Sequence, residues 1–67
     1  MIQINELDYP WQEGMRITDI FPMLGYHLKR PPVLVHINGE TVRRKNWDET
    51  LIPDGSRIRV VRILRGG

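Results

Sequence analysis

The sequence predicts an α+β domain in which one short helix packs on one face of a sheet of four or five strands. Three observations support this class: several short segments alternate apolar and polar residues, one segment has apolar residues at helical spacing, and turn-forming residues separate these segments. A chain of 67 residues makes one domain, residues 1–67, with too small a core for a deep substrate pocket. One helix covers only one face of such a sheet, so the other face is expected to stay open.

The first segments predict a hairpin-like unit. Residues 2–4 alternate apolar and polar side chains, which indicates a half-buried strand. Asn5-Glu6 indicates a turn, and residues 8–12 are predicted to return as a second strand carrying Trp11. Pro10 has no backbone N–H, so this second strand is expected at an edge of the sheet.

The helix is predicted to begin near Thr18 or Asp19, because both residue types are favourable N-caps. Pro22 is placed near the helix start, where its missing N–H matters least, and Gly25 weakens the far end. The apolar residues of this segment share one helical face: Ile17, Ile20, Leu24 and Leu28. Residues 29–32, Lys-Arg-Pro-Pro, cannot continue the helix and form a linker.

The clearest strand of the chain covers residues 33–37, where valine and isoleucine alternate with Leu34 and His36. Asn38-Gly39 is the strongest sequence signal for a tight hairpin, so residues 40–42 should begin the return strand. The polar segment 43–48 is predicted to be a loop or one helical turn, anchored by a buried Trp47.

The last strand follows a turn at Pro53-Asp54-Gly55, where proline presets φ and glycine accepts a positive φ. This strand is predicted from about Arg57 to Leu64. Its alternation breaks after Val60, because Val61 falls on the arginine side and Arg62 on the core side. Either a bulge shifts the phase, or the break marks where the chain leaves the sheet and becomes a tail.

Composition excludes several function classes. The chain has no cysteine, which excludes disulfides, thiolate nucleophiles and thiolate metal sites. The two histidines, His27 and His36, lack a metal-ligand pattern, and no catalytic triad or glycine-rich phosphate loop can be assembled. We therefore expect neither a metal site nor an enzyme active site. No secretion signal and no apolar run of membrane-spanning length is found, so the cytoplasm is the expected compartment and no membrane is involved.

Positive charge is concentrated in the last eleven residues, which contain no acidic side chain but four arginines: Arg57, Arg59, Arg62 and Arg65. Such a strip suits an acidic protein surface or a nucleic acid, and it is also compatible with a solvated strand face. Nucleic-acid binding would need aromatic side chains for stacking. The five aromatic residues are not interleaved with the arginines, so we expect no nucleic-acid partner.

The chain ends in Gly66-Gly67, which either reflects chance or truncation or carries chemistry. Glycine has no side chain, so this end can enter a channel too narrow for other residues and present a bare carboxylate. Attack of that carboxylate on the α-phosphate of ATP would yield an acyl adenylate. A sulfur or amine nucleophile could then displace AMP.

The second half of the chain, residues 33–67, resembles the C-terminal half of the ThiS/MoaD family of sulfur carriers. The shared features are a strand leading into Asn38-Gly39-Glu40, Arg44 ahead of Trp47, then Asp54-Gly55, an apolar strand and Gly66-Gly67. The R-x-x-W spacing of Arg44 and Trp47 is shared with the thiamine-type ThiS branch. The first half resembles the family more loosely, through Glu13-Gly14 ahead of the helix.

The resemblance implies a β-grasp (ubiquitin-like) fold and a carrier that has no catalysis and no bound cofactor of its own. An adenylating enzyme related to ubiquitin-activating enzymes would load AMP on Gly67, with Gly66 providing clearance. A persulfide donor would convert the adduct to a thiocarboxylate, and a downstream synthase would take the sulfur. Thiamine thiazole is the expected product, while molybdopterin, tungsten cofactor and cysteine synthesis also use such carriers.

Two residues depart from the thiamine branch. Arg43 stands where a proline is frequent, and Arg65 stands where a small residue is usual. Arg65 makes the end resemble the Leu-Arg-Gly-Gly of ubiquitin, which keeps open a protein modifier conjugated through Gly67.

The partner surface is predicted on the open sheet face and the start of the tail. Leu34 and His36 should lie on the open face, and Ile63 and Leu64 follow the break in alternation. Exposed apolar residues that lie together usually mark an interface. Residues beyond about Leu64 are expected to be mobile. Three arginines would meet acidic residues around an apolar groove of the partner: Arg59, Arg62 and Arg65.

Overall fold

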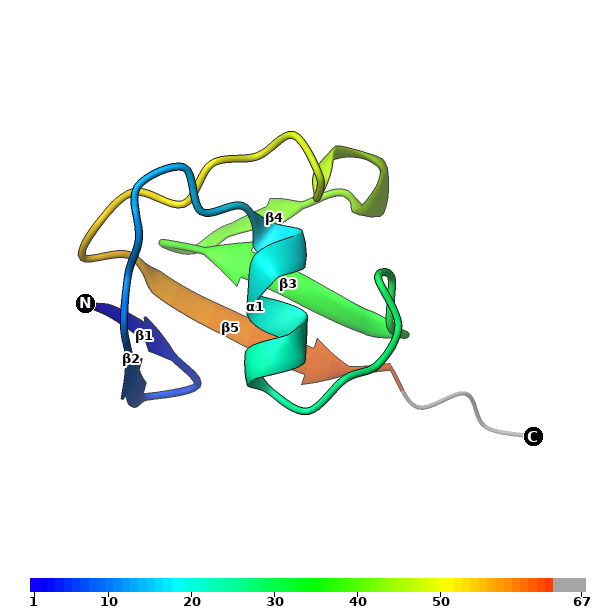
Figure 1. Ribbon diagram of the computed structural model, residues 1–67. Helices are drawn as coiled ribbons and strands as arrows, with labels where there is room; N and C mark the ends of the chain where they lie inside the picture. Colours follow the sequence, from blue (N-terminus) through cyan, green and yellow to red (C-terminus); the bar gives the residue numbers. More distant parts are fainter. Residues whose placement is uncertain (64–67) are drawn as a thin grey trace.

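The computed structural model describes residues 1–63, so the predicted tail beyond Leu64, with Gly66 and Gly67, lies outside the described residues. A mixed five-stranded sheet in the order β2-β1-β5-β3-β4 carries one helix on one face (Figure 1). The elements are β1 (Ile2–Ile4), β2 (Leu7–Tyr9), α1 (Ile17–Met23), β3 (Val33–Ile37), β4 (Glu40–Val42), the 3₁₀ turn η1 (Arg44–Asn46) and β5 (Arg57–Arg62). β1 and β5 run parallel and the other neighbours antiparallel, which confirms the predicted class.

Both predicted hairpin turns are present, and each fastens the neighbouring strand pair to β5. Their central residues have positive φ: 51° and 71° at Asn5-Glu6, and 50° and 87° at Asn38-Gly39. The Asn5 side chain donates to the Val60 carbonyl at 3.1 Å and accepts the Val60 N–H at 2.9 Å. The Asn38 side-chain oxygen accepts the Arg57 N–H at 2.9 Å. The two asparagines therefore extend the sheet hydrogen bonding on both sides of β5.

We expect Asn5→Ala to lower the free energy of unfolding by about 1–3 kcal/mol. The substitution removes two hydrogen bonds and leaves a residue that disfavours positive φ. Urea denaturation measures the loss, with Gln3→Ala on neighbouring β1 as the control. Equal midpoints for the two variants would contradict the role assigned to Asn5.

The helix begins earlier than predicted, so the N-cap positions proposed at Thr18 and Asp19 are wrong. Residues on either side of Arg16 pair with the segment 50–52, with the Ile52 N–H bonded to the Met15 carbonyl at 2.8 Å. This pairing sets the helix start at Ile17, whose side chain is fully buried. Asp19 instead lies in the first turn, where its carboxylate accepts the Arg16 backbone N–H at 2.8 Å.

The helix also ends earlier than predicted. Pro22 lies next to last in α1 rather than in its first turn. Gly25 follows the C-cap with φ of 89°, and the Tyr26 N–H returns to the Phe21 carbonyl at 3.0 Å. This hydrogen-bond pattern is the Schellman motif, which stops a helix. Leu28 therefore lies beyond the helix and is 62% exposed, so its placement on the helical face is wrong.

One core lies between α1 and the sheet, and Trp47 closes it. The Trp47 side chain is 0% exposed, as predicted, and its Nε1 donates to the Val42 carbonyl at 3.1 Å. The Phe21 ring lies 5.0 Å from the Trp47 ring, centroid to centroid. The core residues come from α1, from the three central strands β1, β5 and β3, and from the segments that flank α1 and β5: Ile2, Ile4, Met15, Ile17, Ile20, Phe21, Val33, Val35, Trp47, Ile52, Ile58 and Val60.

The second strand is displaced from its predicted range. β2 covers Leu7–Tyr9 and not residues 8–12, because the tight turn places Leu7 opposite Ile4 and Pro10 cannot donate to a strand. Trp11 lies outside the strand, and its Nε1 donates to the Ile52 carbonyl at 2.7 Å.

The pairing of β5 with β3 is continuous from Ile58 opposite Ile37 to Arg62 opposite Val33, so no bulge is present. Val61 stays in phase and lies on the open face, opposite Leu34. The alternation looks broken because the open face carries apolar side chains as well as arginines. After Arg62 the strand ends, and the Ile63 N–H still donates to the Pro32 carbonyl at 2.9 Å.

Candidate functional site

The sheet face opposite α1 (the open face) gathers side chains that the sequence places far apart. The register of β3 with β5 sets Leu34 opposite Val61 and His36 opposite Arg59. Side chains two residues apart in a strand share a face, so Arg57 belongs to this set. Gln3 on β1 lies opposite Arg57 and adds a polar neighbour.

One half of the open face is apolar. Leu34, Val61 and Ile63 (the apolar strip) are 46%, 41% and 37% exposed. Ile63 is the last described residue, so this strip adjoins the start of the C-terminal segment. Exposed apolar side chains gathered in this way are typical of an interface with another protein.

The other half of the open face is cationic. Arg57 and Arg59 (the cationic pair) line an open hollow of about 470 Å³ together with Gln3, His36 and neighbouring residues. Within residues 1–63 the one ion pair joins the Met1 ammonium to Asp54, so neither arginine of the cationic pair forms a salt bridge within this part of the chain, although Glu6 also lines the hollow. The His36 ring lies 3.0 Å from the Thr41 hydroxyl, Nδ1 to Oγ1, which orients it on the same face.

The structure brings four of the predicted partner residues together and separates a fifth. Leu34, His36, Arg59 and Ile63 all border the open face. Arg62 is opposite Val33, a core residue, so it lies on the other side of β5. Leu64 and Arg65 lie outside the described residues, as do Gly66 and Gly67.

The sequence interpretation missed Val61 as a member of this surface. The signal was available, because Val61 alternates in step with Arg57 and Arg59. From the sequence, Val61 on the arginine side is interpreted as a break in the alternation, through a bulge or the start of a tail, and not as part of a partner surface.

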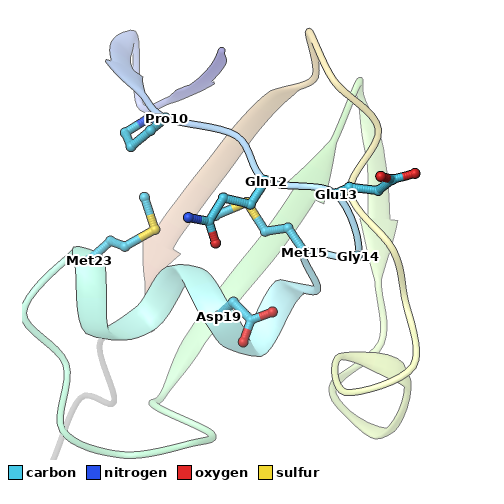
Figure 2. Close-up of a pocket in the computed structure, with 7 residues that line it drawn as sticks. All are labelled: Pro10, Gln12, Glu13, Gly14, Met15, Asp19 and Met23. Atoms are coloured by element: carbon cyan, nitrogen blue, oxygen red, sulfur yellow. The ribbon is translucent and has the colours of Figure 1, made fainter.

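A second hollow, of about 560 Å³, lies between α1 and the segment that precedes it. Figure 2 shows Pro10, Gln12 and Met23 around this hollow, with the Glu13 carboxylate pointing away from them. The Asp19 carboxylate is already bonded to the Arg16 N–H. The lining of this hollow contains no histidine.

Two further properties concern residues 1–63 alone. No three histidine, aspartate or glutamate side chains of this part of the chain gather so as to hold a metal ion. The single described α-helix is too short to cross a membrane.

Comparison with known proteins identifies relatives in sequence and in fold. The model of the ThiS family matches residues 2–67. A crystal structure of a thiamine biosynthesis protein (ThiS) from Geobacter metallireducens is similar, with a TM-score of 0.75, 22% identity, and coverage of 98% of this chain and 97% of that one. An NMR structure of a thiamine biosynthesis protein from the same organism gives a TM-score of 0.72 and 24% identity, covering 98% and 86%. Both likenesses confirm the β-grasp fold. The curated proteins contain no match.

Proposed function

The chain belongs to the ThiS family of small sulfur carriers, and from this premise we propose that Gly67 carries sulfur, as a thiocarboxylate, for the synthesis of thiamine thiazole. The observation that supports the proposal most is that the family match extends to residue 67 and so includes Gly66-Gly67. In this proposal the chain is a co-substrate, and the catalytic groups belong to its partners.

The proposed loading has three chemical steps. A carboxylate oxygen of Gly67 attacks the α-phosphate of ATP, and pyrophosphate leaves. The terminal sulfur of a persulfide then attacks the acyl carbon, and AMP leaves with the electron pair of the broken bond. A thiol reduces the resulting acyl disulfide and frees the thiocarboxylate, which a downstream synthase uses as its sulfur source.

The open face supports docking of an adenylating enzyme beside the tail. The apolar strip adjoins the C-terminal segment, so a partner groove that covers it would hold the tail close to the ATP site. Carboxylates on the rim of that groove would face the cationic pair. Charge of this kind steers the encounter and raises the association rate more than the affinity.

We expect Arg59→Glu to slow association with the adenylating enzyme and to flatten the salt dependence of that rate. Leu34→Ala should instead speed dissociation, because it removes apolar contact area at the centre of the interface. Stopped-flow or surface-plasmon measurements at several salt concentrations separate the two effects. Arg62→Glu makes the same charge change on the other side of β5, so it should slow association less than Arg59→Glu does.

Wild-type rates for both Arg59→Glu and Leu34→Ala at low salt would show that the open face is a solvated sheet surface. Equal slowing by Arg59→Glu and Arg62→Glu would show that net charge, and not the cationic pair, steers the encounter.

Intact-mass analysis tests the proposed function directly. The chain is incubated with ATP, a ThiS-type adenylating enzyme, a persulfide donor and a thiol. The expected product gains the mass difference between one sulfur and one oxygen. A product linked to a lysine of another protein would instead support the modifier function indicated by Leu64-Arg65-Gly66-Gly67. An unchanged mass with a competent enzyme would contradict both.

A further inference from the structure

The side chain of Arg44 joins two segments that flank the sheet. Its Nη2 donates to the Arg30 carbonyl at 2.9 Å. Its guanidinium carbon lies over the Trp47 ring, 5.6 Å from the ring centroid. Trp47 is fully buried and is held by its own hydrogen bond to the Val42 carbonyl. Arg44 is therefore supported by a rigid part of the core on one side and contacts the linker between α1 and β3 on the other.

The linker that Arg44 contacts also binds the last described residue of the chain. The Pro32 carbonyl accepts the Ile63 N–H at 2.9 Å. Between Arg30 and Pro32 lies Pro31, whose side chain is fully buried and whose carbonyl accepts the Val33 N–H at 2.8 Å. Two successive prolines have restricted φ, and they restrict the residue before them as well. The segment 30–32 is therefore stiff, and a displacement of the Arg30 carbonyl also displaces Pro32.

We propose that Arg44 is a positioning residue for the carrier function: by holding the segment 30–32 in place, it sets the direction in which the chain leaves β5 at Ile63. This inference rests on the proposed function, because direction matters only if the following residues must enter a partner's active site. Four residues separate Ile63 from the carboxylate of Gly67. A change of angle at Ile63 would displace the approach of that carboxylate to ATP.

The network also gives the Arg44-x-x-Trp47 spacing a physical reason. Residues three apart in a 3₁₀ turn lie one above the other, so η1 brings the guanidinium over the indole. Arginine is planar and can stack and donate a hydrogen bond at once, whereas lysine offers a point charge that cannot stack in the same way. Lysine at this position should keep the positive charge and lose the stacked orientation that directs the donor toward the Arg30 carbonyl.

The test compares Arg44→Lys with Arg16→Lys. Arg16 makes an equivalent bond elsewhere, from Nη1 to the Asp48 carbonyl at 2.9 Å, near the start of α1. Adenylation by a ThiS-type enzyme is followed by pyrophosphate release, at carrier concentrations corrected for the folded fraction. We expect Arg44→Lys to lower kcat by about tenfold with little change in KM, since a misplaced reactive group slows the reaction while the docking surface is intact. Arg16→Lys should match the wild type in both.

Amide hydrogen exchange gives a second readout that does not depend on the partner. Exchange at Ile63 should accelerate in Arg44→Lys, while the Asn38 amide, bonded to the Arg57 carbonyl at the other end of β5, should be unaffected. Wild-type exchange at Ile63 together with a wild-type kcat would overturn the inference, as would equal losses in Arg44→Lys and Arg16→Lys. If the wild-type chain forms no adenylate, the proposed function fails. Exchange at Ile63 that is equal in Arg44→Lys and in the wild type would then also exclude the coupling between Arg44 and Ile63.

Discussion

Gly66→Val is expected to abolish loading of the carrier without changing its fold. Gly66 lies outside the described residues, and the packing contacts of the core are all made by residues 1–63, so we expect its replacement to leave the core intact. A β-branched side chain would clash in a channel that accepts only glycine, and it would hold the carboxylate of Gly67 away from ATP. Misplacement of a reacting group by about 1 Å costs roughly a hundredfold in rate, and we expect at least that loss here. Pyrophosphate release and the AMP adduct in intact-mass spectra measure it.

Two controls make the Gly66→Val result specific. Gly66→Ala, with a smaller side chain, should lose less activity than the valine variant. Removal of Gly66 and Gly67 should abolish loading, while it would hardly affect a nucleic-acid-binding protein. Adduct formation by Gly66→Val at the wild-type rate would refute the channel argument.

Trp47→Ala is expected to cost about 3–5 kcal/mol of unfolding free energy, the usual range for a buried large aromatic residue. The substitution removes the ring that packs on Phe21, leaves the Val42 carbonyl without its donor, and removes the surface on which Arg44 stacks. Domains of this kind have about 5–15 kcal/mol in total, so a large fraction of the stability would be lost. Thermal and urea denaturation followed by circular dichroism measure the change.

Trp11→Ala is the matched control for Trp47→Ala. Trp11 also donates a hydrogen bond to a carbonyl, that of Ile52, but it packs at the edge of the core and is only partly buried. It should therefore lose clearly less stability. Equal melting temperatures for the wild type and Trp47→Ala would show that the ring contributes nothing to the core.

The face of the sheet on which a side chain lies was predicted correctly where the alternation within one strand is regular. The alternation of residues 33–37 placed Leu34 on the open face, where the structure shows it exposed. Alternation assigns Arg62 to the core side of the last strand, and its pairing with Val33 confirms that side, so Arg62 does not share the open face with Arg59. Pairing with Leu34 places Val61 on the open face, in agreement with its alternation with Arg57 and Arg59.

The sequence by itself determined the turns, most of the strands and the terminal Gly66-Gly67. The turns at Asn5-Glu6 and Asn38-Gly39 contain Asn5, Asn38 and Gly39, which tolerate positive φ, a preference that acts within a few bonds. Contacts between distant segments decided the rest. The helix starts at Ile17 because its preceding residues pair with the segment 50–52. At the end of β5 the Ile63 N–H donates to the Pro32 carbonyl, and Arg44 donates to the Arg30 carbonyl of the same linker. Such contacts depend on the assembled core, since only packing brings these backbone groups together.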